Sequence, residues 1–175
     1  MIIHPDCRDL IVIGGGHAGA EAAMAASRMG VRTLLLAMNL DAIGQMSCNP
    51  SIGGIAKGQL VRELDALGGE MARNTDRSGI HFRTLNESRG PAVRSPRAQC
   101  DKRLYASSLK AALERQENLE LMQDEAVGLW IEGSRLAGVL TRRAGALRSQ
   151  AVVVAAGTFL NGLLHFGLES VPGGR

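Results

Sequence analysis

The chain has 175 residues, of which 45% are hydrophobic and 21% are charged, as is ordinary for a globular protein. This length supports one hydrophobic core, so a single domain over residues 1–175 is expected. The net charge of +3 permits an acidic partner such as RNA without requiring one. No apolar run is long enough to cross a membrane, and the N-terminal residues lack the apolar core of a signal peptide. We therefore expect a soluble, cytoplasmic protein.

The chain has three cysteines, which are widely spaced: Cys7, Cys48 and Cys100. They provide neither a disulfide framework nor a C-x-x-C spacing for zinc, and no metal site is predicted. Reduced thiols of this kind agree with a reducing cytosol.

The first predicted strand, Leu10–Ile13, runs directly into a glycine-rich turn. Its glycines have the G-x-G-x-x-G spacing at which a strand ends, the backbone turns tightly and a helix begins. The free N–H groups at the start of such a helix can bind a pyrophosphate. The turn therefore predicts a dinucleotide site made of six residues: Gly14, Gly15, Gly16, His17, Ala18 and Gly19.

Each glycine of the spacing has its own expected role. Gly14 allows the turn, Gly16 lets phosphate groups approach the backbone, and Gly19 brings the helix close to the strand. A helix over residues 20–29 and a second buried strand over Thr33–Ala37 are expected to follow. A tight turn without a ligand needs the same glycines, but the complete strand–helix–strand context argues against it.

The residue expected to bind the adenosine ribose departs from the usual pattern. An Asp or Glu normally lies about twenty residues after the last glycine, where it bonds to the ribose hydroxyls. This chain has Asn39 at that distance, and the nearest carboxylate is Asp41. The Asn39 amide can still bond to a ribose hydroxyl, without the charge that strengthens the contact. Alternatively, Asn39 is a turn residue that bonds to its own backbone.

The middle of the chain is expected to contain two loops, two helices and one strand. Residues 44–58 form a loop of small residues that is too long for a mere connection, which indicates a functional loop. A helix over residues 59–73, a strand over residues 80–85 and a helix over residues 101–116 are also predicted. Residues 86–99 are expected to form a polar loop.

The densest basic stretch lies in and around this polar loop. Its arginines and lysines can contact phosphates, either of RNA or of a flavin nucleotide, or they form a solvated face. Aromatic residues for base stacking do not alternate with them. The stretch consists of Arg83, Arg89, Arg94, Arg97, Lys102 and Arg103.

The last part of the chain predicts the remainder of a flavoprotein fold. Residues 119–122 are expected as a third parallel strand, and residues 126–132, 136–142 and 146–149 as an antiparallel meander laid over the sheet. The apolar strand 151–156 ends in small residues, which let another group pass close to its backbone. A parallel βαβ core, then a meander, then such an apolar strand is the order found in flavoproteins that bind two dinucleotides. The order of elements therefore favours FAD over NAD as the ligand. We therefore predict an α/β fold with a Rossmann-like parallel sheet and a β-meander, of the glutathione-reductase-like FAD/NAD(P)-binding class.

Four strings of the sequence resemble one family, over about residues 9–175. They are GGGHAGAEAAMAASRMG, GQMSCNPSIGGIAKGQLVRELDALGG, RGPAVRSPRAQCDK and AAGTFLNGLLHFGLESVPGGR. They are similar to the tRNA uridine 5-carboxymethylaminomethyl modification enzymes, the MnmG or GidA family. Members are considerably longer, with an inserted nicotinamide-binding region and a helical C-terminal domain. The chain thus resembles their N-terminal, FAD-binding portion.

The resemblance implies a function and a set of partners. Such enzymes bind FAD, which NADH reduces, and work with the GTPase MnmE on the wobble uridine of certain tRNAs. They add an aminomethyl or carboxymethylaminomethyl group to carbon 5, with the one-carbon unit taken from methylenetetrahydrofolate. A homodimer is expected. On this chain, the family's phosphate loop matches Gly14 to Gly19, and Val127 matches a residue whose backbone contacts the adenine end of FAD.

Cys48 is the predicted reactive residue, because it matches the cysteine of the family motif GQMSCNP. Its thiol can act as a nucleophile toward uridine or as a redox partner. The alternative is a small buried loop residue, the usual fate of a free cysteine. For the chain as a whole, the alternatives are a non-catalytic dinucleotide-binding module and a general FAD-dependent oxidoreductase.

Overall fold

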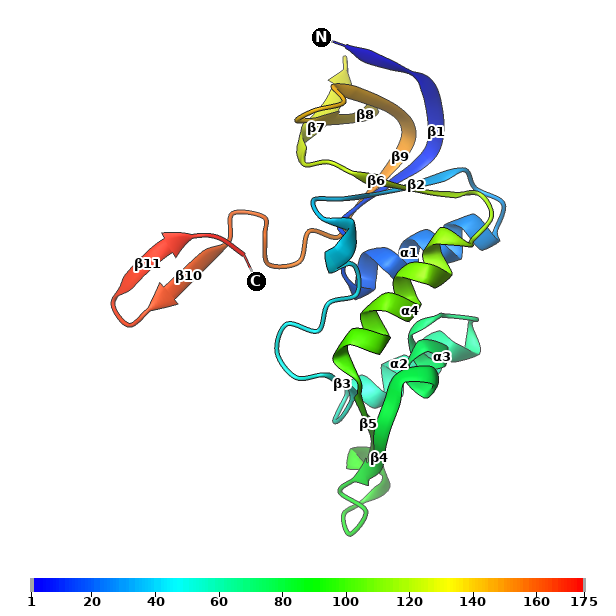
Figure 1. Cartoon of the computed structure of the whole chain (residues 1–175), viewed down its shortest axis with the longest axis vertical. Helices are drawn as coiled ribbons and strands as arrows, with labels where there is room; N and C mark the ends of the chain where they lie inside the picture. Colours follow the sequence, from blue (N-terminus) through cyan, green and yellow to red (C-terminus); the bar gives the residue numbers. More distant parts are fainter. Residues whose placement is uncertain (1, 175) are drawn as a thin grey trace.

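The computed structural model describes residues 2–174. A six-stranded sheet has the order β6–β2–β1–β9–β8–β7 (Figure 1). Strands β6, β2, β1 and β9 are parallel neighbours, and β8 and β7 continue the sheet in antiparallel fashion. Their bounds are β1 Ile3–Ile13, β2 Thr33–Ala37, β6 Leu119–Gln123, β7 Ala126–Glu132, β8 Arg135–Thr141 and β9 Ala146–Val154.

The predicted parallel strands are confirmed, and burial on both faces explains them. Every residue of β2 is buried, and Ile11 and Val12 in β1 are fully so. Helix α1 (His17–Arg28) packs against one face through its alanines, and Gly30, with a φ of +84°, follows its end. Strand β1 begins at Ile3, before its apolar run, because its first half also pairs with β9.

Helix α4 (Lys102–Glu114) packs into the same core cluster as α1 (Figure 1). The Asp101 carboxylate accepts hydrogen bonds from the backbone N–H groups of Arg103 and Leu104 and so caps the helix. The predicted amphipathic helix is thus confirmed. The side chains that it buries are Tyr105, Leu109 and Leu113.

The two predicted loops, residues 44–58 and 86–99, each contain a strand, so that prediction is wrong. These strands belong to a separate antiparallel sheet with the order β3–β5–β4, at the end of the molecule remote from β7 and β8 (Figure 1). Its bounds are β3 Ser51–Gly53, β4 Gly79–Leu85 and β5 Ser95–Cys100, and single 3-10 turns lie at η1 Leu40–Ala42 and η2 Pro91–Val93.

Strand β5 is hard to recognise in the sequence because it is short, polar and contains a proline. Pro96 is tolerated in this central strand because β3 pairs only with residues 97–99, which leaves the Pro96 position paired with β4 alone. The Pro96 carbonyl accepts a hydrogen bond from the Gly54 N–H at 2.8 Å, just where β3 ends. Pairing between distant segments therefore builds this sheet.

The single helix predicted over residues 59–73 is two helices in the structure. Helices α2 (Lys57–Ala66) and α3 (Met71–Ser78) are separated by a turn that contains Gly68 and Gly69. Gly68 has a φ of +88°, a left-handed conformation that ends a helix at little cost when the residue is glycine. The glycine pair therefore breaks the helix.

The meander is continuous with the sheet and does not lie over it, so that prediction is wrong. Residues 146–149 and the apolar part of 151–156 form one strand, β9, which pairs with β8 at its start and with β1 along its length. This double pairing joins the β7–β8 hairpin to the parallel strands. A further hairpin, β10 (Leu163–Phe166) and β11 (Glu169–Pro172), lies outside the predicted elements and projects from the body (Figure 1).

Candidate functional site

The glycine turn lies between the end of β1 and the start of α1, with the end of β9 beside it. Gly14 has a φ of +113°, and a Cβ there would overlap the carbonyl oxygen of Ala155. A Cβ on Gly19 would overlap the carbonyl oxygen of Gly14. Gly14 therefore allows the turn and Gly19 brings helix and strand together, as predicted. The sequence predicts that the small residues after β9 let another group pass close to the backbone, and in the structure that group is the Gly14 backbone.

Gly16 differs from these two glycines because the space beside it is open. Apart from its chain neighbours, no heavy atom of the described residues lies within 4 Å of the position that a Cβ would take. Gly16 is the N-cap of α1, and no side chain caps the helix there. The first N–H groups of α1, those of His17, Ala18 and Gly19, lack partners within the helix. With the positive end of the helix dipole, they suit a phosphate group.

The His17 side chain packs against α4. Its ring centroid lies 5.5 Å from that of Tyr105, and its Nε2 atom is buried. Burial lowers the pKa of His17, so the imidazole is neutral at pH 7. The backbone N–H is therefore the group of His17 that would be available to a ligand at the turn.

The loop that carries Cys48 is hydrogen-bonded to the glycine turn at its first residue, Gly44. The Gly44 N–H donates a hydrogen bond to the Gly15 carbonyl at 2.9 Å. Near the other end of the loop, the Cys100 N–H donates to the Pro50 carbonyl at 2.7 Å. Cys48 lies between these two attachments and is exposed, so the alternative of a buried loop residue is wrong.

The two residues predicted for the adenosine end lie after neighbouring strands. Strands β2 and β6 pair as far as Ala37 and Gln123, and the Asp124 N–H donates to the Ala37 carbonyl at 3.0 Å. Asn39 follows β2, and Val127 follows β6. The fold thus brings both to the edge of the sheet where the glycine turn lies, while their contact with a ligand stays a prediction.

Each of these two residues has a local geometry that bears on its predicted role. The Asn39 Oδ1 atom accepts a hydrogen bond from the Asp41 N–H at 2.9 Å, as the turn alternative predicts. Val127 lies at an irregularity of β7, where the register with β8 shifts between Ala126 and Gly128. A residue at such a shift drops out of the ladder, which frees its backbone groups for a ligand.

Sequence reasoning missed Asp124, a buried carboxylate beside this end of the site. It accepts hydrogen bonds from the N–H groups of Glu125, Arg143 and Ala144 at distances from 2.7 to 3.2 Å. Burial raises the pKa of Asp124, but these hydrogen bonds outweigh burial, and the net pKa is lowered. Asp124 therefore holds the β8–β9 turn against the segment that leads to Val127. A single Asp after a strand gives no sequence signal for this role.

The structure divides the predicted basic stretch among three places. Arg83 on β4 and Arg97 on β5 are directly opposite each other in the antiparallel ladder. The other four lie in the β4–β5 connection (Arg89 and Arg94) and at the start of α4 (Lys102 and Arg103).

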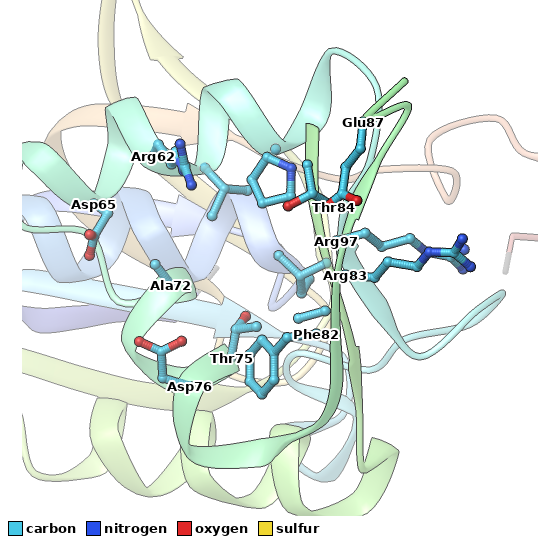
Figure 2. A pocket seen from close by; sticks show the side chains of 16 residues that line it. Arg62, Asp65, Ala72, Thr75, Asp76, Phe82, Arg83, Thr84, Glu87 and Arg97 are labelled. Atoms are coloured by element: carbon cyan, nitrogen blue, oxygen red, sulfur yellow. The ribbon is translucent and has the colours of Figure 1, made fainter. Parts of the chain in front are cut away.

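The β3–β5–β4 sheet is called the small sheet below, and the six-stranded sheet the large sheet. An open hollow of about 590 Å³ lies between α2, α3 and the small sheet (Figure 2). Phe82 points toward Thr75 and Asp76 of α3, whereas Arg83 and Arg97 extend from the other side of the sheet (Figure 2). The two arginines therefore share a face that these helices do not cover.

The cysteines of the chain are free thiols, with Cys100 buried and Cys48 exposed. Within residues 2–174, no group of three metal-ligating side chains occurs. No helix in that range is long and apolar enough to cross a membrane.

Comparison with known sequences identifies the relatives of the chain. The family model "Glucose inhibited division protein A" matches residues 9–175. The tRNA uridine 5-carboxymethylaminomethyl modification enzyme MnmG of Pelobacter propionicus is 59% identical over 167 residues, which are 95% of this chain and 27% of that protein. The chain thus spans about a quarter of the length of this relative.

Solved structures agree with the sequence comparison. GidA of Aquifex aeolicus is 51% identical, with a TM-score of 0.92 over 99% of this chain and 29% of that chain. A GidA-related protein of Thermus thermophilus is 26% identical, with a TM-score of 0.64 over 93% of this chain and 59% of that chain. The predicted fold class is therefore confirmed, and the chain belongs to the glucose inhibited division protein A (GidA) family.

Proposed function

We propose that residues 1–175 are the N-terminal part of the FAD-binding domain of a tRNA-modifying enzyme. With a GTPase partner, this enzyme adds a carboxymethylaminomethyl or aminomethyl group to carbon 5 of the wobble uridine. The observation that carries the proposal is the open space at Gly16, faced by the free N–H groups of α1, in a chain of the GidA family. Because the chain spans 27% of its MnmG relative, the reaction is proposed for an enzyme of that greater length.

FAD fits the residues at the carboxyl ends of the parallel strands. Its pyrophosphate would bind the turn from Gly14 to Gly19, where backbone N–H groups and the helix dipole favour negative charge. The Gly16 space admits a phosphate because no side chain fills it. The adenosine end would contact the Asn39 amide nitrogen, which can donate to a ribose hydroxyl, and the backbone of Val127.

The residue of this chain proposed to react is Cys48. When bound, FAD supplies two-electron redox chemistry, and NADH is its proposed reductant. The Cys48 thiol is exposed on a loop that is held at Gly44 and Pro50, so a nucleobase can approach it. We infer that it acts as a nucleophile or a redox partner toward the uridine.

The proposed partners are a tRNA, the GTPase MnmE and a second copy of the enzyme. The name of the Pelobacter relative supports the tRNA substrate, and membership of the GidA family supports the rest by resemblance. A cytoplasmic location is part of the proposal, and the free thiols of the chain agree with a reducing compartment.

FAD uptake by the purified chain tests the cofactor part of the proposal. We expect the visible flavin spectrum to shift on binding and the Tm to rise with FAD concentration. Gly16→Ala is the matched variant, because its methyl group would occupy the phosphate space without touching other protein atoms. If the unaltered chain shows neither effect, a non-catalytic module becomes the better description.

The role of Cys48 is tested by Cys48→Ser in a gene that encodes an enzyme of the relatives' full length. We expect nucleoside analysis of cellular tRNA to show loss of the wobble-uridine modification, with FAD uptake unchanged. Cys7→Ser is the control, because Cys7 lies on β1, outside the loop. Unchanged modification in Cys48→Ser would remove Cys48 from the reaction. Bound flavin without any tRNA modification by the unaltered enzyme would favour a general oxidoreductase.

A further inference from the structure

Arg83 and Arg97 form a like-charged cross-strand pair that the fold leaves without a counter-ion. They are register partners in the β4–β5 ladder, and their side chains extend in the same direction (Figure 2). Like charges directly opposite each other destabilise a sheet. Among residues 2–174, no carboxylate oxygen lies within 4.0 Å of either guanidinium. By contrast, Arg142, directly after β8, pairs with Glu125, directly before β7.

The rest of this outer face carries polar groups and no acid. His81 and Gln99 are the next cross-strand pair on it, because side chains alternate along a strand. On β3, Ser51 is opposite Gln99, and the Arg97 Nη2 atom donates to the Ser51 Oγ atom at 3.2 Å. None of the three strands contains Asp or Glu, so the only formal charges on this face of the strands are those of Arg83 and Arg97.

The inner face of the same sheet has a different composition. There Phe82 is opposite Ala98, and Ile52 pairs with the same alanine from the other side. These apolar residues line the hollow next to α2 and α3. Among the side chains of this sheet, the cationic ones therefore lie on the outer face.

Two adjacent guanidinium groups match one ligand chemistry closely. Each presents a planar fork of N–H donors that fits the oxygens of a phosphate. Side chains directly opposite in an antiparallel pair begin about 5 Å apart at their Cβ atoms, so both forks can reach the same phosphate. A phosphate group, either free or within a phosphodiester, is thus a ligand that the pair would fit.

The pair is connected directly to the loop that carries Cys48. Ser51, which accepts the hydrogen bond from Arg97, begins the strand that follows Cys48. The Ser51 N–H also donates to the Asn49 carbonyl at 2.8 Å, which ties the strand to the loop. A phosphate bound by the two arginines would thus be held next to the loop that carries Cys48.

We propose that Arg83 and Arg97 together bind one phosphodiester of the tRNA substrate, beside the nucleotide that the Cys48 loop receives. This inference rests on the proposed function and adds the place where the RNA backbone is held. The two arginines are positioning residues, because they contact the backbone of the RNA and leave the base to the loop. Their loss should weaken RNA binding without changing FAD uptake.

Fluorescence anisotropy with a labelled anticodon stem–loop RNA, at several KCl concentrations, tests this proposal on the full chain. We expect Arg83→Gln and Arg97→Gln each to weaken binding about tenfold. The slope of log affinity against log salt should fall by about one in each variant. Because both arginines bind the same phosphate, the double variant should lose less than the product of the two single losses.

Arg115→Gln is the matched control, because Arg115 is an exposed cation at the end of α4, away from the small sheet. It removes the same charge and should leave affinity within about twofold. The Tm of Arg83→Gln should equal or exceed that of the unaltered chain, because a like-charge contact is removed. Equal losses in Arg115→Gln, full RNA affinity in the double variant, or no salt-dependent binding by the unaltered chain would overturn the proposal.

Two further measurements separate the source of the phosphate and the fate of the proposed function. If both variants lose binding of inorganic phosphate while retaining RNA affinity, the site takes free phosphate and the RNA proposal is wrong. FAD uptake is measured on the same samples. If the chain takes up no FAD but its RNA affinity still depends on the two arginines, the cofactor proposal fails and the phosphodiester site stands.

Discussion

The glycine turn after β1 and the outer face of the β3–β5–β4 sheet offer an anion two different kinds of donor. At the turn the donors are backbone N–H groups, and atoms are packed so closely that neither Gly14 nor Gly19 can carry a side chain. On the small sheet the donors are the guanidinium groups of Arg83 and Arg97, which extend from the surface. At the turn, the close packing of Gly14 and Gly19 thus places the free N–H groups that a ligand would use, whereas the arginines on the sheet are not part of the packed core. Substitutions should therefore affect stability at the first place and affinity at the second.

Gly19→Ala should give the largest effect on stability and tests the first half of this comparison. Its methyl group would overlap the Gly14 carbonyl oxygen, a backbone atom that cannot move without opening the turn. We expect the free energy of unfolding to fall by about 3 kcal/mol or more, measured by urea denaturation.

Gly16→Ala is the control for that prediction, because a Cβ there meets open space and the φ of −74° suits any residue. It should cost about 1 kcal/mol or less. Equal urea midpoints for Gly19→Ala and Gly16→Ala would show that close packing at the turn does not determine stability. The comparison between the two regions would then lose its basis.

Replacing Asp124 should give the next largest effect on stability, because its buried carboxylate accepts hydrogen bonds from three backbone N–H groups next to the large sheet. Its folded pKa lies below the ordinary value of 3.8, so the ionised carboxylate stabilises the fold above that pH. The contribution is lost as the pH falls through the folded pKa. Asp124→Ala should cost about 2–3 kcal/mol at pH 7, since backbone donors at the β8–β9 turn lose their acceptor.

Urea midpoints at pH 7, 5, 4 and 3 for the unaltered chain and Asp124→Asn measure the pH dependence. Because the other carboxylates are common to both proteins, their effects cancel in the difference. The difference should be constant above about pH 5 and should shrink as the pH falls below about 4. A difference that is the same at every pH would mean that the charge of Asp124 contributes nothing to stability.

The two regions also differ in how far the sequence reveals them. The roles of Gly14, Gly16 and Gly19 follow from their spacing, because the contacts join residues of a single turn and its flanking strand and helix. Strand β5 cannot be recognised in this way, because its pairing depends on distant segments, as the bond from Cys100 to Pro50 illustrates. Local pattern therefore predicts the glycine turn and misses the small sheet.

Individual residues also show that local sequence pattern predicts local geometry but not contacts between distant segments. The position of Cys48 in a loop follows from the small residues around it, whereas its exposure depends on how Gly44 and Pro50 attach that loop. The pair Gly68-Gly69 weakens the helical pattern over residues 59–73, but apolar residues at the helical period on both sides favour one continuous helix, whereas the structure breaks at Gly68. Asp124 gives no signal at all, since its hydrogen-bond donors come from a turn far along the chain.

Glu21 connects the two regions, and its replacement should give the smallest of these effects. From α1, its carboxylate accepts hydrogen bonds from the backbone N–H groups of Glu70 and Met71, at the start of α3. Glu21→Ala removes this cap and should cost about 1 kcal/mol. Because α3 packs beside the small sheet, amide hydrogen exchange should accelerate in α3 while β1 and β2 stay protected. Glu63→Ala, an exposed acid on α2, is the control and should change neither. If exchange accelerated equally in β1, the large and small sheets would unfold as one cooperative unit. The proposed separation, in which the glycine turn determines stability and the outer face of the small sheet determines affinity, would then be wrong.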